Sequence, residues 1–354
     1  MSRPVLVAPD KFKGTLAAEE AALAIARGLV RGGVESVELL PVADGGEGTM
    51  DALVRGLQGR VLAVEAHDPL GRSVEAAFGL VHSGRSAIVE TAQASGLWRV
   101  APAERDASGA TTRGTGDLIR AAVESGAREV IVAAGGSATT DGGRGALEVL
   151  GARFTKDRAH LDELRATLRR VRLAVACDVR NPLLGPDGAA TVFAPQKGAN
   201  AETVVKLERR LSDWAKLARR STGRDPSAEP MAGAAGGLAG GLWAFAGAEL
   251  RPGAALVLDV AGFDSRARDS FAVVTGEGRL DEQTLAGKAV FEVATRCRQG
   301  GVPCYAVVGT DALDAFEHRL MNLEVEAGTR SGRLAGLDDV ERAAARVARR
   351  LLSF

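Results

Sequence analysis

The chain has 354 residues, of which 45 are Lys or Arg and 45 are Asp or Glu, so its formal net charge is zero. This balance excludes a global electrostatic attraction to nucleic acid or to an anionic membrane surface. Hydrophobic residues make up 46% of the chain, and its length suits about two domains at the usual ~100–200 residues each. No apolar run approaches the ~20 residues of a membrane-spanning helix, and the first residues lack the apolar segment of a signal peptide. The three cysteines are widely spaced, which predicts reduced thiols and a cytoplasmic protein.

Two strand–loop–helix units open the chain. Residues 5–8 predict a buried strand, and Thr15 predicts the N-cap of the helix that follows. Residues 37–42 predict a second strand, which ends in the glycine-rich acidic loop 43–48 before another helix. Residues 61–100 have a different pattern of short alternating runs separated by turn residues, which predicts an antiparallel portion.

The segment 130–150 predicts an anion-binding loop. Residues 130–134 are a short β-branched and alanine run, typical of a buried strand. The loop 135–143 then carries glycines, hydroxyl residues and Asp141, and a helix follows to Leu150, with Gly151 as its stop. The backbone N–H groups of such a loop point toward a bound anion, and glycine allows a phosphate to approach the backbone closely.

The second half of the chain continues the alternation of helices and strands. Strands are predicted at 173–176, 271–274 and 302–308, the second of them leading into a glycine-rich acidic loop at 275–281. The helices expected here cover residues 161–172, 204–218, 233–250, 288–298 and 338–352. Glycine-rich acidic loops thus follow strands three times, at 43–48, 134–143 and 275–281.

The pattern favours an α/β fold with a discontinuous, doubly wound, mostly parallel sheet domain and a second, inserted mixed α/β domain, with a cleft between them. We predict a flavodoxin- or Rossmann-like domain from residues 1–66, 127–190 and 290–354, and an inserted domain from 67–126 and 191–289. In such sheets ligands bind outside the carboxyl ends of the strands.

The residue types in these loops restrict the chemistry. None of the four histidines and none of the three cysteines lies in a glycine-rich loop, which argues against a Ser-His-Asp arrangement, a His-ligated metal and thiol catalysis. The G-x-x-x-x-G-K-[ST] motif is absent, and the loop 135–143 does not fit G-x-G-x-x-G. Carboxylates, lysines, hydroxyls and glycines remain, a set suited to phosphoryl transfer.

Lysine is rare in this chain. Only seven of the 45 basic residues are lysines, and four of them lie in loop-like segments: Lys11, Lys13, Lys197 and Lys288. A lysine that remains where arginine carries most of the surface charge is a candidate for a role that needs a compact ammonium group. Lys11 and Lys13 fit this interpretation best, because they directly follow the first strand.

Several segments resemble the bacterial glycerate kinase family, the class that includes glycerate 2-kinases. These segments are A-P-D-K-F-K-G-T-L at 8–16, P-V-A-D-G-G-E-G-T at 41–49, E-T-A-Q-A-S-G-L at 90–97, T-R-G-T-G-D-L-I at 112–119, G-G-S-A-T-T-D-G-G at 135–143, A-C-D-V-R-N-P-L at 176–183, F-A-P-Q-K-G-A at 193–199, G-A-A-G-G-L at 233–238 and T-G-E-G-R-L-D-E-Q-T at 275–284. They occur in the family's order over about residues 4–310. The chain departs from the family pattern at residues 151–173, which are short and charged, and after Gly309, where the chain is condensed.

The resemblance implies ATP-dependent phosphorylation of glycerate, with Mg²⁺, in a two-domain α/β protein with the active cleft between the domains. The partners expected are ATP and the small acid, without nucleic acid or membrane, in a monomer or small homo-oligomer. The motifs define the machinery better than the acid, so a kinase for another small hydroxy acid stays open. A non-catalytic nucleotide or sugar-acid sensor and a dinucleotide oxidoreductase are the alternatives from other classes.

Each loop residue receives a predicted role. The catalytic candidates are Asp44 as the base, Lys11 and Lys13 at the acid's carboxylate or the γ-phosphate, Asp141, and Arg279, which either neutralises developing charge or pairs with Asp281. The predicted cofactor-binding residues are Gly135, Gly136, Ser137, Thr139, Gly276 and Glu277. The predicted metal ligands are Asp178, Asp141 and Asp281, and Glu47 and Glu90 are expected to support the site from behind. For Asp141 a role as a helix or turn cap is the alternative.

Overall fold

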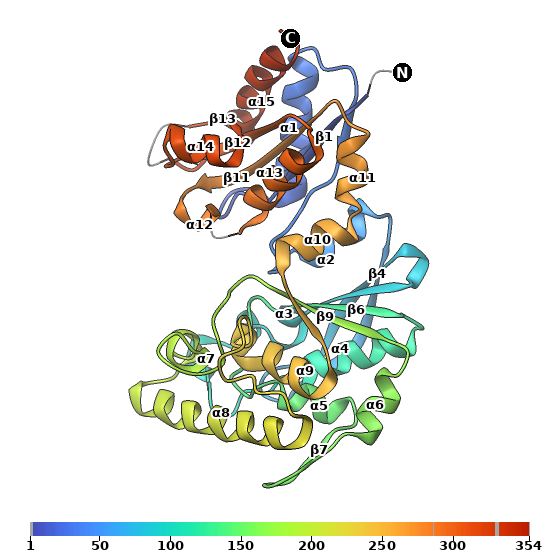
Figure 1. The fold of residues 1–354 in the computed structure, drawn as a ribbon, viewed down its shortest axis with the longest axis vertical. Coiled ribbons are helices and arrows are strands. Elements are labelled where there is room, and N and C mark those ends of the chain that lie inside the picture. The colour runs from blue at the N-terminus through green and yellow to red at the C-terminus, as the bar shows by residue number, and fades with distance from the viewer. Residues whose placement is uncertain (1–2, 286, 330–332, 354) are drawn as a thin grey trace. The chain divides into compact units, whose positions relative to one another are not determined.

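The computed structural model describes residues 3–285, 287–329 and 333–353. The chain forms two compact units (Figure 1). Unit 1 comprises Met1–Asp44, Asp51–Gly56 and Ala254–Phe354, and unit 2 comprises Gly45–Met50 and Leu57–Gly253. Among the described residues, no helix combines the length and the apolar character that crossing a bilayer requires.

Unit 1 is built on a five-stranded sheet in which every neighbouring pair is parallel. Its strand order is β13-β12-β11-β1-β2. The strands are β1 (Val5–Pro9), β2 (Val37–Leu39), β11 (Ala272–Leu280), β12 (Cys304–Asp311) and β13 (Glu324–Ala327). From β1 the chain moves outward to β2, and from β11 it moves outward the other way to β12 and β13. The boundary between β1 and β11 is therefore a topological switch point, the position where open α/β sheets bind ligands.

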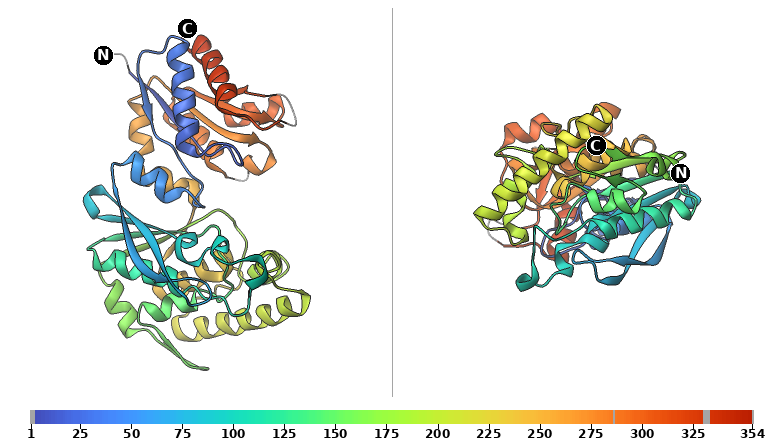
Figure 2. Two further views of the ribbon diagram at one scale, coloured as in Figure 1. Left: turned by 180° about the vertical axis from the view of Figure 1, so that it is seen from behind. Right: turned by 90° about the horizontal axis from the view of Figure 1, so that it is seen from below.

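The helices of unit 1 begin with α1 (Ala18–Arg31) and end with α15 (Leu337–Leu351), which pack along each other (Figures 1 and 2). A Cβ atom at Gly28 would lie 2.3 Å from the carbonyl oxygen of Glu341, so the glycine permits this close helix contact. The remaining helices of this part of the chain are α2 (Thr49–Gly56), α10 (Gly253–Val260), α11 (Phe263–Arg268), α12 (Glu282–Leu285), α13 (Ala289–Gly300) and α14 (Ala315–Met321).

Unit 2 is built on a six-stranded mixed sheet with the order β10-β9-β6-β5-β4-β3. β3 pairs antiparallel with β4 and β4 with β5, whereas β5, β6, β9 and β10 are parallel. The strands are β3 (Arg60–His67), β4 (Ser73–Val81), β5 (Ser86–Glu90), β6 (Glu129–Ala133), β9 (Arg172–Cys177) and β10 (Glu249–Pro252), with a hairpin of β7 (Arg153–Phe154) and β8 (Ala159–His160). The helices are α3 (Thr91–Ser95), α4 (Arg113–Glu124), α5 (Arg144–Val149), α6 (Asp162–Leu168), α7 (Ala189–Phe193), α8 (Ala201–Thr222) and α9 (Leu238–Ala246).

An aromatic cluster under α8 and α9 connects the core of unit 2 to the predicted anion loop. The rings of Phe154, Trp214 and Phe245 contact one another at centroid distances of 4.6–5.2 Å. The indole N–H of Trp214 donates a 2.9 Å hydrogen bond to the carbonyl of Gly142. The loop is therefore held by the packed core, because the indole needs this partner once it is buried.

The fold class is confirmed: the structure is α/β, with one parallel and one mixed sheet. The antiparallel portion predicted for residues 61–100 corresponds to β3, β4 and β5. The compact units divide the chain differently from the predicted boundaries. Residues 127–190 belong to unit 2, because β6 and β9 pair with β5 and β10 and not with the strands of unit 1.

Three local predictions are wrong. The first helix begins at Ala18 with Ala17 as its N-cap, and the Thr15 hydroxyl donates instead to the carbonyl of Phe12. The helix predicted for 233–250 forms only over α9, since Ala235 and Gly236 have positive φ. The loop predicted for 275–281 is mostly strand, because β11 continues to Leu280 in register with β12.

Candidate active site

Three carboxylates gather at the switch point of unit 1. Asp10 follows β1, Glu277 lies in β11 beside it, and Asp44 follows β2 after the short segment 40–43. The backbone N–H of Asp10 donates to the carbonyl of Gly276, and the Asp10 Oδ1 atom accepts a 2.7 Å hydrogen bond from the N–H of Lys11. The Lys11 ammonium lies 3.8 Å from Asp44 Oδ1. The structure thus brings together Lys11, Asp44 and Glu277 of the predicted set.

Two of these carboxyl groups are buried. Asp10 and Glu277 are each 6% exposed. Burial and the neighbouring Asp44 carboxylate raise the pKa of Asp10 to about 7. Burial raises the pKa of Glu277 to about 7 as well, although the Thr284 hydroxyl donates a 2.7 Å hydrogen bond to its Oε1 atom. Burial disfavours the ionised form of both carboxyl groups. Acids with such raised pKa values at a switch point are candidates for proton transfer or ligand binding.

Asp10 is the residue that our sequence prediction of the site missed. It lies in the quoted A-P-D-K segment, directly after a buried strand, which is the position that marks the other candidate carboxylates. Its location at the end of β1 was the available signal.

Replacing Asp10 with Asn is expected to stabilise the protein at high pH. The folded pKa of Asp10 is above its unfolded value, so its stabilising contribution is present below pH ~4 and is lost as pH rises to about 7. Asn keeps an oxygen for the Lys11 N–H and cannot ionise. Relative to wild type, Asp10→Asn should gain about 2–4 kcal/mol of unfolding free energy between pH 5 and pH 8, measured by urea denaturation. A stability difference that is constant with pH would contradict the buried, raised-pKa carboxyl.

The remaining predicted residues of unit 1 lie around this group. Arg279 is 68% exposed on its side chain and lies 3.4 Å from Asp281, so the structure shows the pair that the sequence offered as one alternative. Lys13 is exposed. Gly276 is part of β11, where a Cβ would lie 2.2 Å from the carbonyl oxygen of Val307. Its glycine is thus explained by strand packing in the described structure, and a cofactor contact there stays a prediction.

The loop 135–143 of unit 2 follows β6 as predicted. Gly136 has φ +70°, and a Cβ there would lie 2.1 Å from the Glu47 carboxylate. A Cβ at Gly135 would lie 2.6 Å from the backbone of Gly46. Ser137 and Thr139 are buried. These contacts hold the loop against residues 46–47 with no room for larger side chains.

Asp141 is the organising group of this loop. Its Oδ1 accepts from the N–H of Gly143, and its Oδ2 accepts from the N–H of Gly145 and from both the N–H and the hydroxyl of Thr112, at 2.8–3.1 Å. Four hydrogen bonds to one carboxylate favour the capping role over that of a metal ligand.

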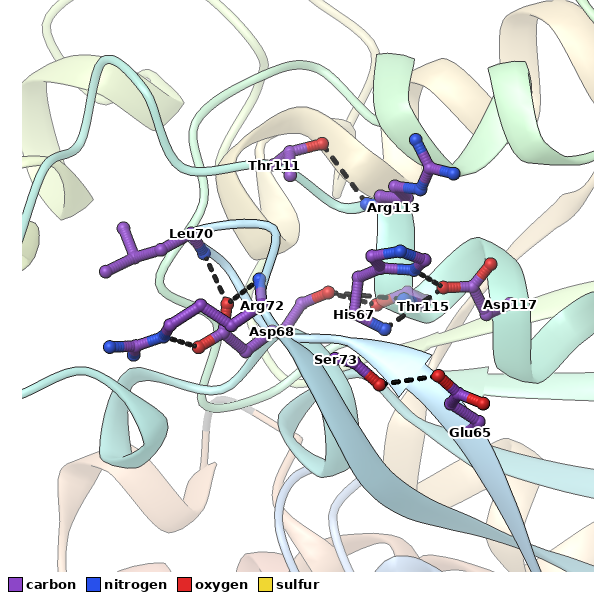
Figure 3. Close-up of polar contacts among 11 residues, drawn as sticks. Glu65, His67, Asp68, Leu70, Arg72, Ser73, Thr111, Arg113, Thr115 and Asp117 are labelled. Atoms are coloured by element: carbon purple, nitrogen blue, oxygen red, sulfur yellow. Dashed lines mark hydrogen bonds and ion pairs between the residues drawn. The ribbon is translucent and has the colours of Figure 1, made fainter.

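The turn between β3 and β4 supports the start of α4 (Figure 3). Thr112 is the N-cap residue of α4. Asp68 is 2% exposed and accepts hydrogen bonds from two backbone N–H groups of the turn and from the Arg72 guanidinium. Burial raises its pKa, but these hydrogen bonds outweigh that effect and hold the pKa below its usual value. His67 Nδ1 lies 2.7 Å from Asp117 Oδ2 in α4, and the turn's Pro69 carbonyl accepts from the Thr111 N–H.

Two more acids end parallel strands of unit 2. Glu90, at the end of β5, is buried, and its Oε1 atom accepts a 2.7 Å hydrogen bond from the N–H of Met50 at the start of α2. Asp178, after β9, is exposed. Within the described residues, no group of three or more His, Cys, Asp or Glu side chains is arranged to hold a metal ion. Mg²⁺ is usually held by one or two carboxylates, with water and phosphate oxygens completing the shell. Asp178 in unit 2 is exposed and Asp281 in unit 1 is partly exposed, so each could contribute one carboxylate to such a shell.

The protein is of the α/β class: unit 1 carries acids at the switch point of its parallel sheet, and unit 2 carries the glycine–hydroxyl loop after β6. A family model described as the glycerate kinase family matches residues 5–350, which extends about 40 residues past the C-terminal end of the motifs near residue 310. The chain belongs to the glycerate kinase family.

Similar proteins agree with this assignment. A glycerate kinase from Bacillus subtilis is 42% identical over 329 residues, which cover 88% of this chain and 86% of that protein. A glycerate 2-kinase from Escherichia coli is 37% identical, covering 86% of this chain and 85% of that protein. A crystal structure of a candidate glycerate kinase 2 from Salmonella typhimurium LT2 has a TM-score of 0.85 and 36% identity, and covers 100% of this chain and 98% of that one.

Proposed function

We propose that this protein transfers the γ-phosphoryl group of ATP to a hydroxyl of glycerate, with 2-phosphoglycerate as the favoured product. The family and the names of its members support the kinase class and the acid. The observation that carries the chemistry is the group of acids at the switch point of unit 1, with Lys11 beside Asp44. Phosphoryl transfer needs mainly positioning and charge neutralisation, and these residue types supply both.

In the proposed reaction the substrate oxygen forms a bond to the γ-phosphorus as the bond from that phosphorus to the bridging oxygen of ADP breaks. The hydroxyl proton passes to the Asp44 carboxylate, which is half-buried and reachable. Lys11, with Lys13 nearby in sequence, supplies positive charge for the acid's carboxylate or for the transferring group. Bound Mg²⁺ supplies charge neutralisation at the phosphates.

The residues of unit 2 supply phosphate recognition in this proposal. In this proposal Gly135 and Gly136 offer backbone N–H groups to an anion, and the buried Ser137 and Thr139 add hydroxyls. Asp141 fixes the shape of the loop through four hydrogen bonds. Asp178 and Asp281 remain the proposed metal carboxylates.

A coupled assay of ADP release tests this function. The purified protein, with ATP and Mg²⁺, is offered D-glycerate, L-glycerate, lactate, glycolate and tartronate in turn. We expect D- or L-glycerate to give the highest kcat/KM. Turnover with another acid alone would favour the alternative kinase. Binding of ATP without turnover on any acid would favour a sensor and reject the proposal.

A further inference from the structure

Lys197 is a buried lysine that the proposed chemistry has not used. It ends a short 3₁₀ turn (Pro195–Lys197) after α7 and is 2% exposed. Its ammonium donates a 3.0 Å hydrogen bond to Ser137 Oγ and a 2.6 Å hydrogen bond to the carbonyl of Thr139. Both acceptors belong to the loop 135–143. A buried lysine is rare unless something compensates its charge.

The Lys197 ammonium has more N–H donors than the described residues have acceptors for it. An ammonium carries three N–H donors, and the described residues provide acceptors for two. The hydroxyl oxygens of Thr139 and Thr140, in residues that are 0% exposed, have no hydrogen-bond partner among the described residues. Native proteins seldom leave such groups without partners, because each costs the loss of its water. An oxyanion can accept hydrogen bonds from an ammonium group and from hydroxyl groups, the donor types that this segment leaves without partners.

Two positively charged side chains also donate hydrogen bonds to the segments around Lys197. Arg210 in α8 donates to the carbonyl of Thr140. Arg105 donates to the carbonyl of Gln196, beside Lys197. The one carboxylate that acts on Lys197, that of Asp141, already accepts four hydrogen bonds from its own loop and Thr112. Asp106 is a second carboxylate that acts on Arg210, whereas Asp141 is the carboxylate that acts on Lys197.

We propose that Lys197, with the hydroxyls of Thr139 and Thr140, forms a binding site for an oxyanion, either a carboxylate or a phosphate group of the substrates. The inference rests on the proposed function, because it assigns this site to the anionic groups of that reaction. A purely structural role would account for the two hydrogen bonds that Lys197 donates to the loop. It would not account for the buried hydroxyls of Thr139 and Thr140. The predicted role of the loop 135–143 is anion binding, and Lys197 would supply the positive charge that its glycine and hydroxyl residues lack.

The site has a definite pH dependence. Burial lowers the pKa of Lys197 to about 7, partly offset by the charge of Asp141. The ammonium form is therefore lost as pH rises through about 7, and affinity for the anion should fall over the same range. Burial lowers the pKa of Arg210 as well, against the opposing charges of Asp141 and Asp106.

Calorimetric titration of the full chain tests the site with three probes: D-glycerate, a non-hydrolysable ATP analogue with Mg²⁺, and inorganic phosphate, each at pH 6.5 and pH 8.5. For wild type, at least one probe should bind more tightly at pH 6.5. Lys197→Met should weaken that probe about tenfold or more at pH 6.5. Lys197→Arg should keep binding within a few-fold and remove its pH dependence. The D-glycerate arm identifies a carboxylate as the ligand, and the other two arms identify a phosphate.

Thr139→Val and Thr140→Val test the oxyanion site independently, even if Lys197→Met does not fold. Neither hydroxyl has a protein partner among the described residues, so the valine variants should be at least as stable as wild type. Each should weaken the same probe by about three- to tenfold. Lys216→Met, an exposed lysine on α8 paired with Asp213, is the matched control and should bind like wild type.

Unchanged affinity for all three probes in all the loop variants would overturn the inference, as would a wild type that binds none of them. The proposed function fails separately. A wild type that binds a phosphate probe through Lys197 but releases no ADP with glycerate would remove the kinase assignment and leave the oxyanion site in place.

Discussion

Replacing Asp44 with Asn is expected to lower kcat by ~10²-fold or more, with a much smaller change in KM. The proposed base accepts the hydroxyl proton only as the new P–O bond forms, so its loss acts on the transition state. Asn keeps the size of the side chain and removes the charge that lies 3.8 Å from the Lys11 ammonium. Steady-state kinetics with saturating ATP and varied glycerate measure both constants.

Two further variants define what the Asp44 result means. Asp51→Asn removes an exposed carboxylate in the first turn of α2 and should keep the wild-type rate. Lys11→Met separates proton transfer from ion pairing, because it breaks the same pair and leaves the carboxylate. If Asp44→Asn retained an intact kcat, Asp44 would not be the base. If Lys11→Met reproduced its kinetics in full, Asp44 would act only by holding the lysine.

Gly135→Ala is the second change with a large expected effect. Gly135 does not have a positive φ, so glycine is needed here for space and not for backbone conformation. The added Cβ would lie 2.6 Å from the Cα atom of Gly46, whose carbonyl accepts the Thr49 hydroxyl at the start of α2. A backbone atom cannot rotate away as the end of a flexible side chain can. The loop at Gly135 and the segment at Gly46 must therefore move apart.

We expect this separation to lower kcat/KM by ~10²-fold, the cost of misplacing a site by about 1 Å, and to destabilise the protein by about 1–3 kcal/mol. Gly300→Ala is the control, since its Cβ would meet Val302 at an ordinary 3.7 Å near the end of α13. Thermal melting and the coupled assay measure both effects. Wild-type activity with wild-type stability in Gly135→Ala would show that the loop tolerates the displacement.

The sequence predicted the βα units well because each one is local. Alternating periodicity, glycine stops and strand-end acids correctly indicated β1, β6, β9 and the loop 135–143. The prediction from sequence was wrong where the structure depends on pairing between strands that are distant in the chain. Gly276 and Gly278 predicted a loop, yet β11 continues through them in register with β12. At Gly276 the carbonyl of Val307 in β12 leaves no room for a Cβ, and at Gly278 the backbone of Phe12 and Lys13 lies close. The division into units depended on which parallel strands share a sheet, and periodicity carries no such information.

The candidate site was predictable in part, for similar reasons. Asp44 and Lys11 could be named from their positions after strands, and Glu277 from a glycine-rich segment that proved to be strand; the structure brings the three together. The burial of Asp10 and of Lys197 could not, because burial depends on distant segments of the chain. The hydrogen bonds that favour capping by Asp141 could not be foreseen either, since the partners include Thr112, 29 residues earlier in the chain.

The central claim is phosphoryl transfer from ATP to glycerate, and ³¹P NMR of the reaction mixture tests it most directly. Wild-type protein with ATP, Mg²⁺ and glycerate should convert the γ-phosphate signal into that of a phosphomonoester, with the ADP signals rising in step. Two-dimensional ¹H–³¹P correlation should place the phosphate on the C2 oxygen. Phosphate on the C3 oxygen would correct the position while keeping the kinase. Release of inorganic phosphate alone, or no change in the ATP signals, would contradict the account.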